Sequence, residues 1–243
     1  MRKNVFKKKL FFGFVIFVIL ILIFSFSLWL KKKFYGLACF KVKKIEFRGN
    51  IDEGIKKYIF SSLKGKPIFF NLDSLYKEML KHFPSIKEIR ILKKFPSTIV
   101  FKVEKRKPFL QVRDDYIYVI DEELKIIGKT RGILKGNLPV VEVGRLKKEF
   151  SLGERLGEER VREAVQFFKI LKKETKFSPQ VILAYRLNSL SFVEKGTKFI
   201  IGGKDWHKKL EILESILKEK FDNDFGSLRY VDLREERIYI GRK

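Results

Sequence analysis

The residues from Leu10 to Leu30 carry no charged side chain, and this run constrains the fold of the chain more than any other sequence feature. Lysine triplets flank it at 7–9 and 31–33. A helix over these residues would be roughly 31 Å long, about the thickness of a bilayer's hydrocarbon core, and it would satisfy its own backbone groups. A cleaved signal peptide has a shorter apolar region, followed by a small-residue cleavage site rather than by lysines. We therefore expect one uncleaved transmembrane helix over 10–30.

The basic flanks do not orient this helix, because lysines and arginines lie on both sides of it. Long C-terminal domains cross membranes largely regardless of charge, whereas a short basic tail has no bulk to fold. We expect residues 1–9 to be a cytoplasmic tail and 31–39 a juxtamembrane linker. Everything beyond the linker is then extracytoplasmic.

The chain is strongly basic, with 54 Lys and Arg against 29 Asp and Glu and a net charge of +25. Such a surface attracts anionic lipid, acidic wall polymers or nucleic acid. Bases and acids are interspersed beyond residue 33, however, as in thermophilic proteins, and the aromatic residues mostly lie on predicted core stripes. We therefore expect no nucleic-acid partner. The single cysteine, Cys39, excludes an internal disulfide.

Residues 40–106 have the pattern of a small strand-helix-helix-strand-strand domain. Ile45 and Phe47 alternate with polar neighbours, and apolar stripes with helical spacing follow over 51–63 and 72–80. Two alternating segments around 89–92 and 98–103 then flank a turn at 93–97. A small sheet covered on one face by helices leaves its edges for other contacts, which favours docking over catalysis.

Residues 107–243 are richer in strands. Helices are expected over 158–173 and from Asp205, which would cap the second one. Extended segments are expected at 116–120, 124–127, 139–143, 181–187, 191–194, 198–201, 230–234 and 237–240. The predicted fold class is α+β: an N-terminal transmembrane helix, a β-α-α-β-β domain at 40–106, and a mixed, strand-rich β domain with two helices at 107–243.

The sequence contains no pattern that indicates catalysis. His82 and His207 lie outside any metal-site or acid-base spacing, and no phosphate-binding loop or nucleophile motif occurs. The neighbouring acids Glu122 and Glu123 would diverge on a strand. We expect no enzyme activity, cofactor, metal site or small-molecule substrate.

The chain resembles the FtsQ/DivIB family of bacterial cell-division proteins over nearly its whole length. The order is similar: a basic tail, a membrane helix, a POTRA domain opening with the sequence IEFRGN at 45–50, and a β domain. Further similar stretches are FPSIKEIRI at 83–91, KFPSTI at 94–99, VEKRKP at 103–108, VID at 119–121 and VDLR at 231–234. The residues that carry the resemblance are Gly49, Asn50, Phe95, Pro96, Glu104, Pro108, Asp232, Leu233 and Arg234.

The resemblance implies a non-catalytic scaffold in the bacterial inner (cytoplasmic) membrane at the division septum, with a single span and a cytoplasmic N-terminus. Its partners would be division proteins of the FtsB/DivIC and FtsL types and, through them, the septal wall synthase. A strand at the end of the chain is a plausible sheet edge that accepts a partner strand. The hypothetical docking residues are Arg234, Glu235, Arg237, Ile238, Tyr239 and Ile240.

Three alternatives remain open. The docking residues could simply close the sheet, and Glu235 stands where the family often has an aromatic residue. The chain could be a cationic envelope-binding module, whose binding would weaken as salt rises. It could also be a POTRA-type secretion component, although such components usually precede a membrane barrel.

Overall fold

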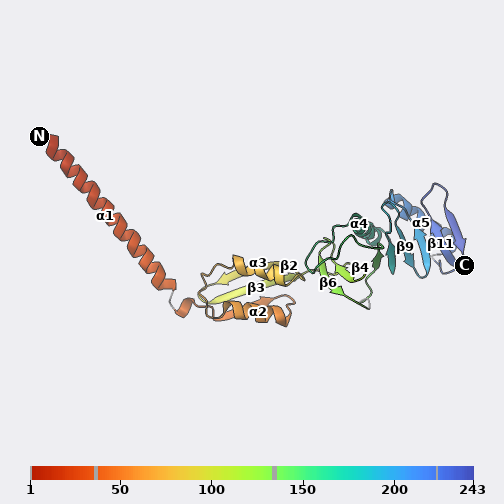
Figure 1. The fold of residues 1–243 in the computed structure, drawn as a ribbon, viewed down its shortest axis with the longest axis horizontal. Helices are drawn as coiled ribbons and strands as arrows, with labels where there is room; N and C mark the ends of the chain where they lie inside the picture. Colours follow the sequence, from red (N-terminus) through yellow and green to blue (C-terminus); the bar gives the residue numbers. More distant parts are fainter. Residues whose placement is uncertain (1, 36–37, 133–135, 223) are drawn as a thin grey trace. The chain divides into compact units, whose positions relative to one another are not determined.

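The computed structural model is a mixed α+β fold (Figure 1) that describes residues 2–35, 38–132, 136–222 and 224–243. The side chains of 2–14, 31–32, 34–35 and 38 lie outside the description. The chain divides into two compact units. Unit 1 consists of Met1–Met79 and Glu88–Glu104, and unit 2 of Leu80–Lys87 and Lys105–Lys243.

The first helix, α1, runs over Arg2–Tyr35, and a short 3-10 helix, η1, follows at Ala38–Phe40. The prediction of a transmembrane helix with limits at Leu10 and Leu30 must be corrected. Among the residues that the structure describes, no helix combines the length and the apolarity that crossing a membrane requires.

Unit 1 contains the expected strand-helix-helix-strand-strand order. Its elements are β1 (Lys44–Arg48), α2 (Glu53–Leu63), α3 (Asp73–His82), β2 (Ile86–Lys94) and β3 (Thr98–Lys105), of which α3, β2 and β3 extend into residues of unit 2. The strand order is β1-β3-β2, with β1 parallel to β3. Both helices bury one stripe, as Ile59 on α2 and Met79 on α3 illustrate, and Phe101 is buried on β3. The side chain of Asn71 accepts a hydrogen bond from the Asp73 amide at 2.9 Å, which satisfies one of the free amides at the start of α3.

Unit 2 is built on one nine-stranded sheet with the order β12-β11-β10-β9-β8-β7-β4-β5-β6. The strands are β4 (Leu110–Arg113), β5 (Ile117–Ile120), β6 (Ile126–Thr130), β7 (Val140–Glu142), β8 (Val181–Leu183), β9 (Ser191–Glu194), β10 (Thr197–Ile200), β11 (Leu228–Asp232) and β12 (Tyr239–Arg242). Strand β7 runs parallel to both β4 and β8, and β10 is parallel to β11, whereas the other pairings described are antiparallel.

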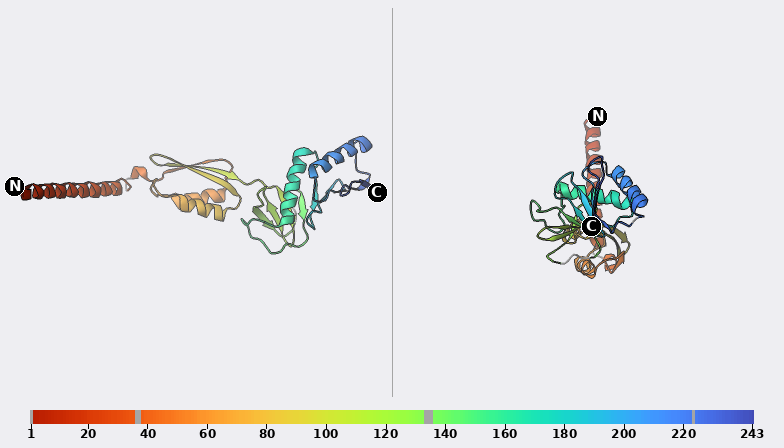
Figure 2. Two further views of the ribbon diagram at one scale, coloured as in Figure 1. Left: turned by 90° about the horizontal axis from the view of Figure 1, so that it is seen from above. Right: turned by 90° about the vertical axis from the view of Figure 1, so that its right-hand side faces the viewer.

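Two helices, α4 (Glu159–Glu174) and α5 (Trp206–Phe221), lie beside these strands (Figure 2). They share one continuous apolar core with the sheet, in which Phe167 of α4 and Leu213 of α5 are fully buried with Phe192 and Phe199 of the strands. Helix α5 begins after Asp205, as expected. Asp205 has a φ of +56° and makes no side-chain cap hydrogen bond, so the predicted capping by its carboxylate is wrong.

Candidate functional site

Strand β12 forms one edge of the nine-stranded sheet. In the described part of the chain it pairs only with β11, in an antiparallel register that places Asp232 opposite Tyr239 and Val231 opposite Ile240. An unpaired edge presents a row of backbone donors and acceptors to another chain. The hydrogen-bonding groups on the outer side of β12 are therefore the first feature of the site.

The chain returns into β12 through a turn organised by Asp232 and Arg234. The Asp232 carboxylate accepts hydrogen bonds from the Arg234 backbone amide at 3.1 Å and from its guanidinium at 2.7 to 3.1 Å. Hydrogen bonding from Arg234 lowers the pKa of Asp232 below its usual value, against the opposing effect of burial. Leu233 between them is buried, and its amide donates to the Ile200 carbonyl at 2.8 Å. The VDLR stretch therefore anchors the end of β11 and starts the return.

The structure spreads the predicted docking residues over this return and the edge strand itself. Arg234 and Glu235 lie exposed in the turn, Arg237 and Ile238 precede β12, and Tyr239 and Ile240 begin it. The side chains alternate. Ile238 and Ile240 are half-buried against the core of unit 2, whereas Tyr239 is 54% exposed.

Residues Gly241 and Arg242, which the sequence analysis left out of the edge, belong to β12 as well. Gly241 lies opposite Tyr230 of β11, and the tyrosine ring occupies the space that a side chain at Gly241 would need. A glycine inside a strand pattern marks such a close approach, and that signal was available in the sequence.

The opposite edge of the sheet, β6, is partly covered by the chain that follows it. The Ile126 amide donates to the Glu154 carbonyl and the Gly153 amide donates to the Ile126 carbonyl, both at 2.9 Å. An isolated bridge also joins Lys125 to Arg155. Such covering is a common protection of sheet edges. Within the described residues, β12 is thus the more accessible of the two edges.

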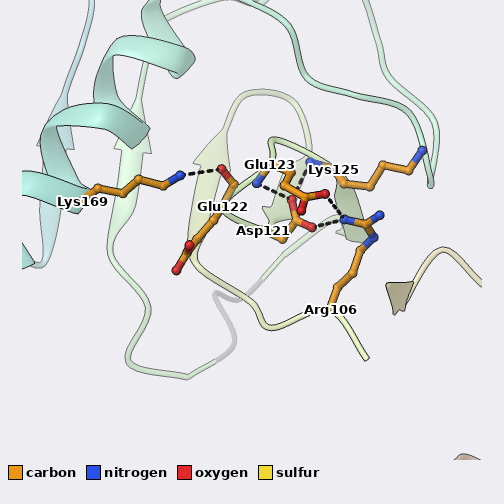
Figure 3. Close-up of polar contacts among 6 residues, drawn as sticks. All are labelled: Arg106, Asp121, Glu122, Glu123, Lys125 and Lys169. Carbon is orange, nitrogen blue, oxygen red and sulfur yellow. Dashed lines mark hydrogen bonds and ion pairs between the residues drawn. The ribbon is translucent and has the colours of Figure 1, made fainter. Parts of the chain in front are cut away.

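A second polar cluster lies where the chain enters unit 2 (Figure 3). The Arg106 guanidinium donates to the Asp121 carboxylate at 2.5 Å and to the Glu123 carboxylate at 2.8 Å. The other Asp121 oxygen accepts from the backbone amides of Glu123 and Lys125, and Lys169 of α4 donates to the Glu122 carbonyl. These bonds close the turn between β5 and β6 and fasten the residue after β3 to it. We interpret the cluster as a structural clamp that holds Arg106 against the turn between β5 and β6.

The remaining motif residues have structural or surface positions. Gly49 has a φ of +101°, and a Cβ there would lie 2.7 Å from the Val103 carbonyl oxygen, so only glycine fits. Glu104 lies in β3, and Asn50, Phe95, Pro96 and Pro108 are exposed.

The histidines and acids do not assemble a reactive centre in the part of the chain that is described. His207 is within 2.7 Å of Glu174 beside a pocket of about 480 Å³ between α4 and α5, lined also by Glu211 and Glu214. In the same residues, no group of three or more His, Cys, Asp or Glu side chains is placed to hold a metal ion. The β12 edge is accordingly the feature on which a functional interpretation rests.

Comparison of the chain with protein-family models finds no match, and comparison with curated proteins finds none either.

Proposed function

We propose that this chain is a non-catalytic cell-division scaffold of the FtsQ/DivIB type, which receives an extended segment of an FtsB/DivIC-type partner on the β12 edge. The observation that carries the proposal is this edge: β12 ends the nine-stranded sheet, and within the described residues only β11 pairs with it. The order of the family-like motifs along the chain supports the identity of the partner.

Strand addition explains why the edge needs no catalytic side chain. Main-chain hydrogen bonds to β12 provide affinity, and the alternation of side chains provides specificity. One face of an added strand would lie next to Ile238 and Ile240, at the margin of the core, and the other next to the exposed ring of Tyr239. Tyrosine is one of the residues that most often contribute strongly to binding at interfaces.

The basic side chains at the two ends of β12 favour acidic residues at the ends of the partner segment. Arg237 precedes the strand, Arg242 ends it, and both are exposed. Arg234 is already paired with Asp232 at 2.7 Å. Complementary charges at an interface raise the association rate and fix the register more than they raise affinity. An acidic residue near either end of the incoming strand would therefore set its register on β12.

The role beyond this contact is assembly. A scaffold that holds an FtsB/DivIC-type protein also holds the FtsL-type protein bound to it, and through both it influences septal wall synthesis. Each step requires only binding surfaces, which agrees with the proposed absence of catalysis.

The binding test compares two exposed apolar side chains of unit 2. Tyr239→Lys places a charge on the β12 edge, whereas Leu152→Lys places the same charge beside the covered β6 edge, at a residue that is 53% exposed. Affinity of the full chain for the FtsB/DivIC-type protein of the same genome is measured by calorimetry. Loss of the aromatic contact is expected to weaken binding at least about tenfold in Tyr239→Lys, with little change in Leu152→Lys. Equal affinities for both variants and the unmodified chain would show that the edge is not the docking site.

The cellular test is depletion of the protein. Cells that lack a division scaffold continue to grow but do not septate, so filaments are expected. Normal septation without the protein would contradict the division role whatever the binding data show.

A further inference from the structure

Three segments of unit 1 meet at one end of its sheet, where the chain enters β1 (Figure 1). The Ile68 amide donates to the Phe40 carbonyl at 2.7 Å, and the Lys43 amide donates to the Ser97 carbonyl at 2.9 Å. These bonds join the entry segment 38–44 to the loop 64–70 and to the turn between β2 and β3. We call this region the phenylalanine end and define it by Phe40, Phe69 and Phe95.

The three rings form a continuous apolar surface. The Phe69 ring lies 5.4 Å from the Phe40 ring and 5.4 Å from the Phe95 ring, measured between centroids. Phe95 is 60% exposed and Phe69 37% exposed. The rings therefore contact one another without being buried in the core of unit 1. Grouped exposed aromatic residues mark an interaction surface more often than isolated ones do.

Lysines surround these rings. The exposed lysines on the three segments are Lys41, Lys43, Lys44, Lys64, Lys66, Lys93 and Lys94. The same stretches, 38–46, 64–70 and 92–97, contain a single carboxylate, Glu46. Its oxygens are within 2.8 Å of Lys44 and 3.4 Å of Lys94. Among the described residues, no carboxylate lies within ion-pair distance of Lys41, Lys43 or Lys64. The phenylalanine end thus combines an apolar surface with a positive rim whose charge is largely uncompensated.

We propose that the phenylalanine end docks on an anionic lipid surface. Phenylalanine side chains enter the boundary between headgroups and acyl chains, and lysines around them bind lipid phosphates. An acidic wall polymer would use the lysines but would leave the Phe69 and Phe95 rings in water. This proposal is independent of the docking edge on β12, because it rests on a different unit and on different residues.

The first test reports on the phenylalanine end directly. Phe95→Trp is made in the full chain together with Trp29→Phe, so that Trp206 is the one native indole that remains. Vesicles of phosphatidylcholine with or without phosphatidylglycerol, both with brominated acyl chains, are added. The indole at position 95 is expected to shift its emission to the blue and to be quenched by the anionic vesicles, and far less by the neutral ones. Leu187→Trp, at a 48% exposed residue of unit 2, is the control that should remain unquenched.

The second test concerns the lysines. The triple variant Lys41→Gln, Lys43→Gln, Lys64→Gln is compared with Lys204→Gln, Lys208→Gln, Lys218→Gln, which removes the same charge from exposed positions of unit 2. The measured quantity is the lipid concentration at which quenching at position 95 is half complete. At roughly fivefold per lysine, the first triple should weaken this binding about a hundredfold and the second only slightly.

Three results would overturn the proposal. In the first, the indole at position 95 shows neither an emission shift nor quenching. In the second, the two triple variants weaken vesicle binding equally. In the third, the chain would bind an acidic polymer or single-stranded nucleic acid through these lysines while vesicles left position 95 unchanged. Circular dichroism of each variant checks that the fold is retained, as expected for substitutions at exposed positions.

Discussion

The ring of Tyr230 on β11 lies across the backbone of Gly241 on β12. A Cβ atom built on Gly241 would be 2.3 Å from Cε1 and 2.7 Å from Cδ1 of this ring. The two residues are cross-strand neighbours, and the register of β11 shifts by a bulge between Leu228 and Tyr230. The position of the edge strand therefore depends on a glycine, because no other residue leaves room for the ring.

We predict that Gly241→Ala displaces Tyr230 and loosens the edge. Hydrogen exchange of the amides from Tyr239 to Arg242 should become faster, and partner binding should weaken. Because the clash is with the ring, adding Tyr230→Ser to Gly241→Ala should restore slow exchange. Gly157→Ala, which meets no atom within 4 Å, is the control. Unchanged exchange in Gly241→Ala would show that β12 does not depend on this contact.

A second prediction concerns the clamp at the entry to unit 2. Asp121 is 5% exposed and accepts hydrogen bonds from Arg106 and from two backbone amides, so its removal leaves the half-buried Arg106 with Glu123 alone and two backbone donors unpaired. Asp121→Ala should lower the free energy of unfolding of unit 2 by about 3 kcal/mol. Glu123→Ala removes only the exposed partner of Arg106 and should cost less than about 1 kcal/mol. Urea unfolding measures the loss of stability in each variant. Equal losses for Asp121→Ala and Glu123→Ala would contradict the role of Asp121 as the centre of the clamp.

A third prediction compares two glycines of unit 1. Gly49 has a positive φ and lies against the Val103 carbonyl, whereas Gly54 is in helix α2 and has open space around it. Gly49→Ala should destabilise unit 1 by at least about 2 kcal/mol, and Gly54→Ala should stabilise it by up to about 1 kcal/mol. Thermal unfolding gives both values. The essential result is that the two substitutions change the free energy of unfolding with opposite signs. An alanine at position 49 that leaves stability unchanged would contradict the close approach of Gly49 to the Val103 carbonyl.

The fourth prediction concerns pH. Glu194 ends β9, is 8% exposed and accepts a hydrogen bond from the Ser178 amide at 2.7 Å. Burial raises its pKa above the ordinary value of 4.5 despite this bond and the charge of Lys195. The folded state then binds the proton more readily than the unfolded chain, so this group adds stability as the pH falls from 7 toward 5 and loses it as the pH rises. Unfolding of Glu194→Gln should lack this contribution. If the free energy of unfolding of the variant and of the unmodified chain changed with pH in parallel, Glu194 would make no such contribution.

Much of the local structure could be predicted from the sequence because each element has a periodic apolar face. Helix α4 was expected over 158–173 and runs over Glu159–Glu174. The order of elements in unit 1 was expected in the same way. The transmembrane assignment of the first helix was wrong. The order of the strands in the sheet of unit 2 was not predicted. The parallel pairing of β7 with both β4 and β8 joins segments that are far apart in the sequence, and no local sequence pattern indicates it.

The candidate site was predicted in part. A final strand was expected at 237–240, and β12 covers Tyr239–Arg242 because Arg237 and Ile238 still belong to the return from Arg234. The contact between Tyr230 and Gly241 needs the register of β11 and β12, which a single sequence does not contain. For the same reason, the pairing of Arg106 with Asp121 was not expected.

The most direct test of strand addition at β12 is a scan of the partner segment with N-methylated residues. A peptide from the FtsB/DivIC-type protein of the same genome is synthesised with one backbone amide methylated at a time, and its affinity for the full chain is measured. If the peptide pairs with β12, methylation should abolish binding at every second residue and leave the alternate residues nearly unaffected, since only alternate amides face the edge. Affinity that is insensitive to methylation, or that changes without this period of two, would contradict the account.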